Sequence, residues 1–248
     1  MKKFGIIGNP LTHSFSSKFF SEKFQSLNID AQYFNFPISS IEEFPELLKT
    51  HSNLEGLNVT MPYKVQIIQY LTYISDEAKK IGCVNVVKII RDNKNLKLIG
   101  YNTDIIGFIN SLSPMIKPHH KKALILGTGG AAATVAYGLS LLGIEYSFVS
   151  RFSSENSLTY NLLTADIINA HKLIVNTTPL GMYPDNEQFP DIPYIGFSNK
   201  HLAYDLIYNP ETTKFMENAS KHNAIIKNGY EMFILQAEEA LKILVHPQ

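Results

Sequence analysis

Residues 124–132 read Leu124-Ile125-Leu126-Gly127-Thr128-Gly129-Gly130-Ala131-Ala132, an apolar run that passes directly into a glycine-rich loop. This order is typical of a buried strand that turns on glycines into a helix, whose first N–H groups can bind a pyrophosphate. The loop fits the pattern G-x-G-x-x-A: the first glycine permits the turn, the second lets phosphate approach the backbone, and the small third residue allows close helix–strand packing. A tight turn that only saves space is the alternative. The stretch therefore predicts an α/β domain that binds a dinucleotide.

The next predicted strand, Tyr146-Ser147-Phe148-Val149-Ser150, is followed by Arg151, where an NAD-binding protein would place a carboxylate against the ribose hydroxyls. A guanidinium instead binds a phosphate through planar, charge-assisted hydrogen bonds. Ser150 and Arg151 therefore favour a cofactor with a 2′-phosphate, which is NADP(H). A solvated surface arginine is the alternative.

Two further stretches end strand-like runs in polar groups: Asn58-Val59-Thr60-Met61-Pro62-Tyr63-Lys64 and Gly100-Tyr101-Asn102-Thr103-Asp104-Ile105-Ile106-Gly107. Reduction of a ketone leaves negative charge on oxygen, so such a site needs a proton donor or a fixed cation close to that oxygen. Together with a dinucleotide, Lys64 and Asp104 indicate redox chemistry on a small polar molecule. Taken singly, Lys64 fits a solvated lysine and Asp104 a helix N-cap.

The composition is that of an ordinary soluble protein with a sizeable core: 248 residues, of which 45% are hydrophobic and 18% charged. Lys+Arg and Asp+Glu both number 22, so no long-range field attracts nucleic acid or an anionic membrane surface, and small-molecule partners are expected. The single cysteine, Cys83, excludes an internal disulfide, and no run approaches membrane-spanning length. We therefore expect a cytoplasmic protein, and no metal is expected.

Strands and helices alternate in the first part of the chain, with strands expected near 4–8, 32–36 and 56–60 and helices near 16–27 and 42–49. This alternation implies parallel strands.

The polar turn 91–95 separates two further strands, 84–90 and 96–101, as in a hairpin at the edge of the first sheet. A helix is expected from Asp104 to Leu112. A new series of strands then begins near Ala123, Tyr146, Lys172 and Ala203, which indicates a second domain, and a last helix is expected from about Gly229 to Val245.

Taken together, the three blocks resemble the shikimate dehydrogenase family, whose signatures are N-V-T-x-P-x-K, G-x-N-T-D-x-x-G and a G-x-G-G loop. The resemblance runs almost end to end. It implies that Lys64 is the acid/base group and that Asp104 orients Lys64 and hydrogen-bonds the substrate hydroxyls. It implies further substrate contacts at Ser14, Ser16, Thr60, Asn85, Tyr208 and Gln236. It implies cofactor contacts at Asp76, Gly127, Thr128, Gly129, Gly130, Ala131, Ser150, Arg151, Thr177, Leu206 and Gly229. Each of these residues alone also fits a loop, cap or packing position.

The fold implied by the resemblance is α/β: a mostly parallel N-terminal substrate domain, a Rossmann-like dinucleotide-binding domain, and a C-terminal helix that returns to the first domain. The expected boundaries are 1–103 plus 230–248 for the substrate-binding catalytic domain and 104–229 for the NADP-binding domain.

The activity implied is the reversible, NADPH-dependent reduction of 3-dehydroshikimate to shikimate, in the biosynthesis of chorismate and the aromatic amino acids. An NAD-using quinate/shikimate dehydrogenase is the nearest alternative, and a non-catalytic nucleotide-binding sensor of the same fold is another. A homodimer is compatible with this interpretation, although the sequence does not reveal the oligomeric state.

Overall fold

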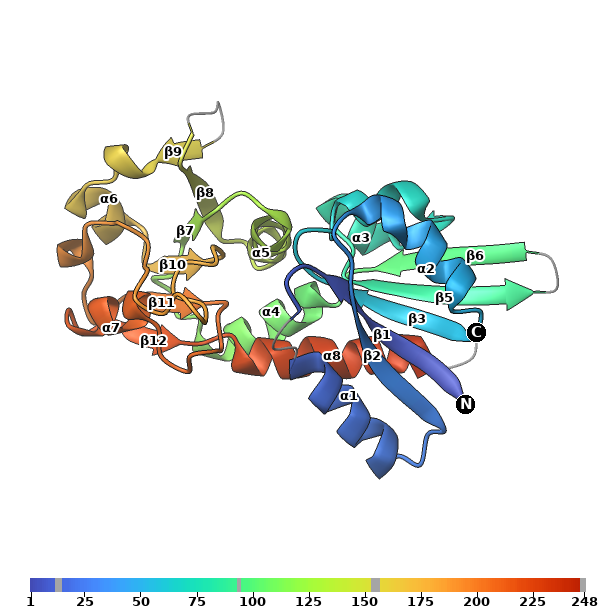
Figure 1. The fold of residues 1–248 in the computed structure, drawn as a ribbon. Helices are drawn as coiled ribbons and strands as arrows, with labels where there is room; N and C mark the ends of the chain where they lie inside the picture. Colours follow the sequence, from blue (N-terminus) through green and yellow to red (C-terminus); the bar gives the residue numbers. More distant parts are fainter. Residues whose placement is uncertain (12–14, 93–94, 153–156, 246–248) are drawn as a thin grey trace. The chain divides into compact units, whose positions relative to one another are not determined.

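The computed structural model describes residues 1–11, 15–92, 95–152 and 157–245, which form two compact units (Figure 1). Unit 1 comprises Met1–Asp104 with Gln236–Gln248, and unit 2 comprises Ile105–Leu235. Each unit contains one six-stranded sheet with helices on both faces, which confirms the predicted α/β class. The second boundary falls at Gln236 rather than at residue 230, inside the last helix.

The strands of unit 1 are β1 (Lys2–Gly8), β2 (Ala31–Pro37), β3 (Leu54–Val59), β4 (Tyr73–Ile74), β5 (Val86–Asp92) and β6 (Asn95–Tyr101). Their order in the sheet is β2-β1-β3-β5-β6-β4. β1 is parallel to both of its neighbours, whereas β5 is antiparallel to β3 and β6. The antiparallel pair β5–β6 is the predicted hairpin, but it does not form the sheet edge, because β4 adds to β6 in parallel.

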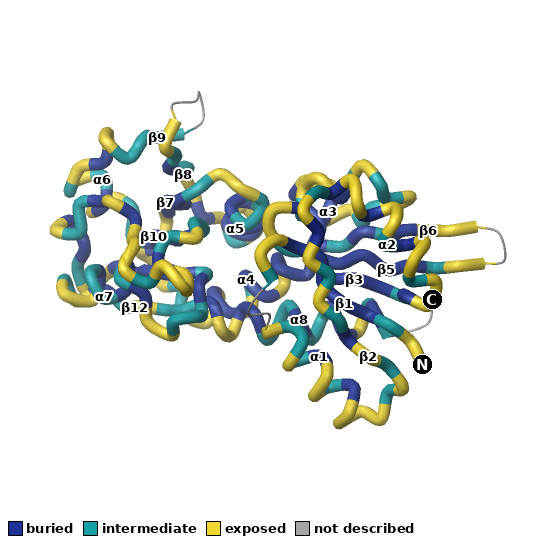
Figure 2. Tube along the Cα trace, viewed as in Figure 1, coloured by how far each residue is buried: buried dark blue, intermediate teal, exposed yellow. Residues whose placement is uncertain are grey.

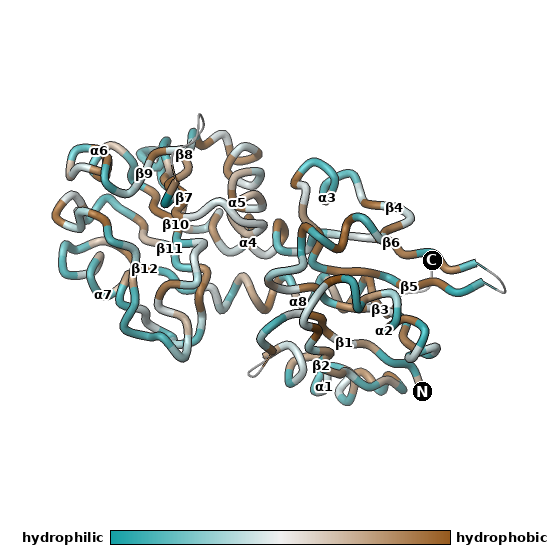
Figure 3. The backbone as a smooth tube through the Cα atoms, turned by 45° about the horizontal axis from the view of Figure 1, so that its top comes forward, coloured by the Kyte–Doolittle hydropathy of each residue, from teal (hydrophilic) through white to brown (hydrophobic). Residues whose placement is uncertain are grey.

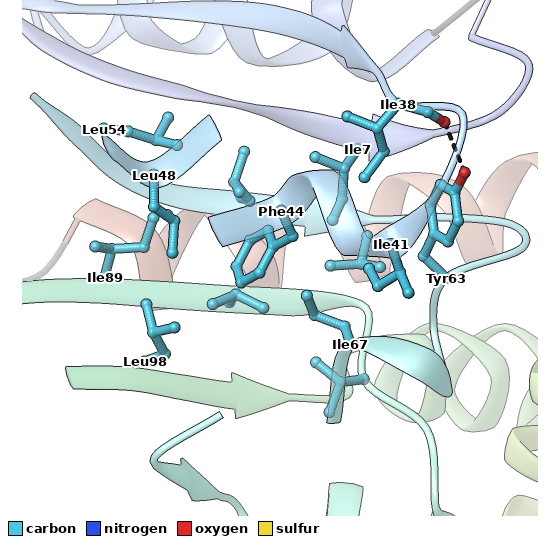
Figure 4. Close-up of a cluster of buried hydrophobic side chains, with 14 of the residues drawn as sticks. Ile7, Ile38, Ile41, Phe44, Leu48, Leu54, Tyr63, Ile67, Ile89 and Leu98 are labelled. Atoms are coloured by element: carbon cyan, nitrogen blue, oxygen red, sulfur yellow. Dashed lines mark hydrogen bonds between the residues drawn. The ribbon is translucent and has the colours of Figure 1, made fainter. Parts of the chain in front are cut away.

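Helices cover both faces of the unit 1 sheet. These are α1 (Phe15–Ser26), α2 (Phe44–Thr50), the short α3 (Asp76–Ile81) and the C-terminal part of α8 (Tyr230–Val245). Phe20 and Phe24, four residues apart, are the buried residues of α1, and Figure 3 shows hydrophobic residues recurring among hydrophilic ones along this helix. On the other face, Phe44 and Leu48 of α2 pack into a cluster that also contains Ile7 (Figure 4).

The strands of unit 2 are all parallel: β7 (Lys122–Leu126), β8 (Glu145–Ser150), β9 (Ser157–Thr159), β10 (Leu173–Asn176), β11 (Leu202–Asp205) and β12 (Ile225–Lys227). Their order is β12-β11-β10-β7-β8-β9. This is the doubly wound order in which the chain changes direction between the first and fourth strands, and ligands of such sheets bind at the carboxyl ends there. The carboxyl ends of β7 and β10 are therefore the expected binding edge.

Both faces of the unit 2 sheet are covered by helices, which are α4 (Asp104–Leu112), α5 (Gly130–Leu141), α6 (Ala165–Ala170), α7 (Lys214–Ser220) and the first part of α8. Ile125 packs into the cluster on one face, and its neighbours Leu124 and Leu126 pack into the cluster on the other. Figure 2 shows the resulting buried strands. This explains why β7 is apolar from Ala123 to Leu126 rather than alternating.

The C-terminal helix α8 begins in unit 2 and belongs to unit 1 from Gln236 onward. Ala237, Ala240 and Leu244 of this second part pack in one cluster with Phe4 of β1. The prediction that the last helix returns to the first part of the chain is thereby confirmed.

Candidate active site

Lys64 lies in the turn that follows β3, and this turn is fixed by its neighbours. Tyr63 is buried, its hydroxyl donates to the carbonyl of Ile38 at 2.6 Å, and its N–H donates to the carbonyl of Thr60 at 2.9 Å (Figure 4). The carbonyl of Lys64 accepts from the N–H of Val84 at 2.9 Å. These bonds fix the backbone from which the Lys64 side chain extends.

Asp104 is the first residue of α4, separated from the end of β6 by Asn102 and Thr103, and its carboxylate meets the lysine side chain. Lys64 Nζ lies 2.6 Å from Asp104 Oδ2, and the two side chains are 20% and 10% exposed. Partial removal from water strengthens the attraction between the two charges. The pair predicted from two distant blocks of sequence is therefore formed within unit 1.

The Asn85 amide contacts the carboxylate of Asp104, and Thr103 and Gln236 in turn bond to Asn85. Asn85 Nδ2 donates to Asp104 Oδ1 and to Thr103 Oγ1, both at 2.9 Å, and Asn85 Oδ1 accepts from the N–H of Thr103 at 2.7 Å. Gln236 Oε1 accepts from Asn85 Nδ2 and from Thr103 Oγ1, both at 3.3 Å. We call Lys64, Asn85, Thr103, Asp104 and Gln236 the lysine–carboxylate cluster. Both oxygens of Asp104 have partners, so its carboxylate has one fixed orientation.

The remaining predicted substrate contacts lie on other segments of the chain. Thr60 follows β3 and lies against Gly8, where an added Cβ would stand 2.4 Å from Thr60 Cγ2. Ser16 is a partly exposed residue in the first turn of α1. Ser14 lies outside the described residues. Tyr208 is partly exposed and belongs to unit 2, in the loop after β11.

The glycine-rich loop follows β7 as predicted. Gly127 has φ of 113°, a conformation that L-residues with side chains rarely adopt, and its N–H donates to the carbonyl of Val149 at 2.9 Å. Thr128 is exposed, whereas Ala132 is fully buried against the sheet. The loop thus has the turn, the open side and the close helix contact that the G-x-G-x-x-A pattern predicts.

No side chain of the described residues caps the N-terminal end of α5, the helix that follows this loop. Gly129 is its N-cap residue and supplies no side-chain hydrogen bond, and nothing lies within 4 Å of a Cβ added there. Gly130 and Ala131, the first two helical residues, are partly exposed. Their N–H groups have no acceptor inside the helix, so an anion can bind them.

Other predicted cofactor contacts lie at the carboxyl ends of neighbouring strands. Thr177 Oγ1 donates to the carbonyl of Leu126 at 2.6 Å and would stand 2.7 Å from a Cβ on Gly127. A Cβ on Gly229 would stand only 2.0 Å from the carbonyl oxygen of Leu206. The structure therefore places Thr177 beside Gly127 and Leu206 beside Gly229.

Arg151 follows β8 and is exposed. Its guanidinium carbon lies 5.8 Å from the ring centre of Phe152, and the N–H of Phe152 donates to Ser150 Oγ at 3.2 Å. Among the described residues, no carboxylate lies within ion-pair distance of Arg151. A positive group without a competing carboxylate suits a phosphate ligand.

Asp76, the one predicted cofactor contact in unit 1, is an exposed residue in the first turn of α3. Ser75, and not Asp76, caps this helix, because Ser75 Oγ accepts from the N–H of Ala78 at 3.3 Å.

Thr103 joins the cluster although we assigned it no role from the sequence. It is part of the same block as Asp104, so that motif could have identified it. Asp205, outside this cluster, is a second residue to which we assigned no role: it is fully buried at the end of β11, and no pattern around it distinguishes it from a packing position.

Within the described residues, no three His, Cys, Asp or Glu side chains are grouped so as to hold a metal ion. The helices in that part of the chain all lack the length and apolar character needed to cross a membrane.

The sequence matches a family model described as the shikimate dehydrogenase substrate binding domain over residues 6–87. Over 260 residues the chain is 35% identical to a protein named shikimate dehydrogenase (NADP(+)) from Caldicellulosiruptor saccharolyticus, with 98% of this chain and 92% of that protein covered.

Solved structures of shikimate dehydrogenases match the structure of this chain over nearly its whole length. Shikimate 5-dehydrogenase from Thermus thermophilus in complex with NADP(H) and shikimate matches with a TM-score of 0.85 and 28% identity, covering 99% of this chain and 94% of that one. Shikimate 5-dehydrogenase from Listeria monocytogenes in complex with shikimate and NAD matches with a TM-score of 0.82 and 26% identity, covering 100% and 93%.

Proposed function

Because this chain belongs to the shikimate dehydrogenase family, we propose that it catalyses the reversible, NADPH-dependent reduction of 3-dehydroshikimate to shikimate. The observation that carries the proposal is the contact of 2.6 Å between Lys64 Nζ and Asp104 Oδ2 in a partly buried cluster. In this proposal unit 1, which covers most of the substrate domain expected at 1–103 plus 230–248, supplies most of the substrate contacts, and unit 2 supplies most of the cofactor contacts.

Lys64 is the acid/base group in this proposal. Reduction of the ketone places negative charge on oxygen, and the Lys64 ammonium can neutralise that charge and deliver a proton. Asp104 holds the ammonium in place through Oδ2, while its Oδ1 is fixed by Asn85. In the reverse direction the amine accepts the proton of the substrate hydroxyl.

Shikimate and 3-dehydroshikimate carry hydroxyl groups and a carboxylate, and hydroxyl and amide side chains can bind both. Asn85 and Gln236 supply amides, and Asp104 supplies a carboxylate that can accept from the substrate hydroxyls, within one cluster. The substrate contacts that we propose are Ser14, Ser16, Thr60, Asn85, Asp104, Tyr208 and Gln236.

NADPH supplies the hydride when bound, and the residues of unit 2 fit this cofactor. The open space at Gly129 and the uncapped N-terminus of α5 suit a pyrophosphate, and exposed Arg151 suits a 2′-phosphate. The cofactor contacts that we propose are Asp76, Gly127, Thr128, Gly129, Gly130, Ala131, Ser150, Arg151, Thr177, Leu206 and Gly229.

NAD is the alternative cofactor, favoured by the Listeria monocytogenes relative that was solved with shikimate and NAD. Steady-state kinetics with both cofactors, and with shikimate and quinate, decide between the candidates. We expect kcat/KM to be highest for shikimate with NADP⁺. Arg151→Ala should lower the kcat/KM for NADP⁺ about 10-fold or more and should change the kcat/KM for NAD⁺ little. Binding of NADPH without turnover would instead favour the nucleotide-binding sensor.

Two further expectations accompany this proposal. We propose that the protein forms a homodimer, which analytical sedimentation tests, and that it is cytoplasmic, which cell fractionation tests. The proposed substrate is a small molecule.

A further inference from the structure

Asp205 at the end of β11 is a fully buried carboxylate with three hydrogen-bond donors. Its Oδ1 accepts from Asn176 Nδ2 at 3.1 Å and from the N–H of Ile207 at 3.0 Å. Its Oδ2 accepts from Thr213 Oγ1 at 2.6 Å. Because its side chain has no exposed surface, Asp205 cannot touch a ligand itself.

The hydrogen bonds continue from Asn176 into the loop after β10. Asn176 Oδ1 accepts from Thr178 Oγ1 at 2.7 Å and from the N–H of Thr178 at 3.1 Å. The carbonyl of Asn176 accepts from the N–H of Leu206 at 3.0 Å. Asp205 and Asn176 therefore join the loop that bears Thr177 to the loop that bears Leu206.

Thr213, on the other side of the carboxylate, also reaches the loop after β10. Gly181 in that loop has φ of 98°, and a Cβ added to it would stand 3.4 Å from Thr213 Cβ. A backbone hydrogen bond of 3.1 Å from Tyr183 to Asn209 adds a further link between the two loops. The carboxylate thus lies at the centre of contacts between segments 176–183 and 205–213.

A buried charge of this kind does not serve stability alone. Burial raises the pKa of Asp205 to about 6, although its three donors oppose that shift. Removing a carboxylate from water costs free energy that its hydrogen bonds only partly offset, and an apolar side chain of similar size would avoid this cost. The presence of Asp205 is better explained by the geometry that it imposes on the two loops. A carboxylate has acceptor lone pairs on both oxygens and can therefore bind all three donors at once.

We propose that Asp205 is a positioning residue that holds the loops after β10 and β11 in the arrangement that binds NADPH. The inference rests on the proposed function, in which Thr177 and Leu206 contact the cofactor. Thr213, Asp205, Asn176 and Thr178 form one connected chain of hydrogen bonds across these two loops.

Fluorescence titration of NADPH tests this without any need for turnover. We expect Asp205→Asn to raise the dissociation constant of NADPH about 10-fold or more, because an amide cannot accept from all three donors. Thr213→Val removes one donor without changing the carboxylate and is expected to weaken binding about 10-fold, whereas Thr213→Ser keeps the hydroxyl and restores it. The KM of shikimate should change much less than that of NADP⁺ in these variants.

Tyr204→Phe is the matched control. Tyr204 precedes Asp205 on β11 and shares a buried hydrogen bond of 2.6 Å with Ser111, but this bond does not involve either loop. The control should lower the melting temperature and leave NADPH binding unchanged. Wild-type NADPH affinity in both Asp205→Asn and Thr213→Val, or equal weakening in Tyr204→Phe, overturns the proposal. A wild-type chain that binds NADPH but does not reduce 3-dehydroshikimate refutes the proposed activity alone.

Discussion

In the proposed reaction Lys64 is the proton donor, and its partner Asp104 accepts a hydrogen bond from it. We expect Lys64→Ala to lower kcat about 10²- to 10⁴-fold, the range for a positioned proton donor, with a smaller change in the KM of shikimate. Steady-state kinetics measure both quantities.

Lys23 provides a matched control in the same unit. Its Nζ lies 2.9 Å from Glu238 Oε1, but these side chains are 36% and 44% exposed. Lys23→Ala should therefore leave kcat within about twofold of wild type. Turnover of a folded Lys64→Ala variant close to the wild-type rate would remove Lys64 from the mechanism.

Sequence reasoning identified Lys64 and Asp104 because each belongs to a polar block that ends a strand-like run and because these blocks resemble the signatures of the family. It did not identify the bridge that Thr103 makes between Asn85 and Gln236, because a hydroxyl finds its partners only in the folded chain. The roles of Lys64 and Asp104 in the reaction stay predictions.

At the scale of elements, the long strands and the last helix follow from the sequence, whereas β4, β9 and β12 do not. These strands have only two or three residues, too few to produce a recognisable period. Each adds to the edge of a sheet formed by longer strands, so its position depends on tertiary contacts.

We expect opposite results from replacing two glycines that precede helices, Gly229 and Gly129, with alanine. A Cβ on Gly229 would meet the carbonyl oxygen of Leu206 at 2.0 Å, whereas a Cβ on Gly129 would meet nothing within 4 Å. Gly229→Ala should therefore destabilise the protein by about 1–3 kcal/mol, because the backbone must move. Gly129→Ala should change stability by less than about 1 kcal/mol but raise the KM of NADP⁺, because its methyl group would lie where the proposed function puts the pyrophosphate.

Calorimetry and steady-state kinetics on the two variants separate these effects. If Gly229→Ala melts at the wild-type temperature, the contact with Leu206 does not constrain the start of α8. If Gly129→Ala binds NADP⁺ as tightly as wild type, the pyrophosphate does not approach this part of the loop.

At the scale of the whole molecule, the sequence predicted the α/β class and the return of the last helix, both confirmed here. It did not predict the strand orders, since these depend on which distant segments pair. The alternation of strands and helices is the same for any order of a parallel sheet. The substrate and cofactor roles of the two units stay proposals.

We expect two buried histidines, His120 and His201, to set the acid stability of unit 2. His120 Nδ1 accepts from the N–H of Lys117 at 3.0 Å, and His201 Nδ1 accepts from the N–H of Ser198 at 3.0 Å. Burial lowers the pKa of both residues, and the electrostatic effect of His119 lowers it further. As the pH falls, these histidines therefore bind protons in the unfolded chain before they do so in the folded protein. The contribution of the two histidines to stability is complete above about pH 6.5 and is lost as the pH falls below it.

Asp205 acts in the opposite direction, because its pKa is raised to about 6 and the folded state gains this proton first. We expect calorimetry between about pH 7.5 and about pH 5 to show a falling melting temperature. The fall should be steeper in Asp205→Asn, which lacks the opposing group, and shallower in a His120→Gln/His201→Gln double variant. His222→Gln controls for the loss of a histidine elsewhere in unit 2. A double variant with the wild-type slope would mean that the two buried histidines do not set the acid stability of this unit.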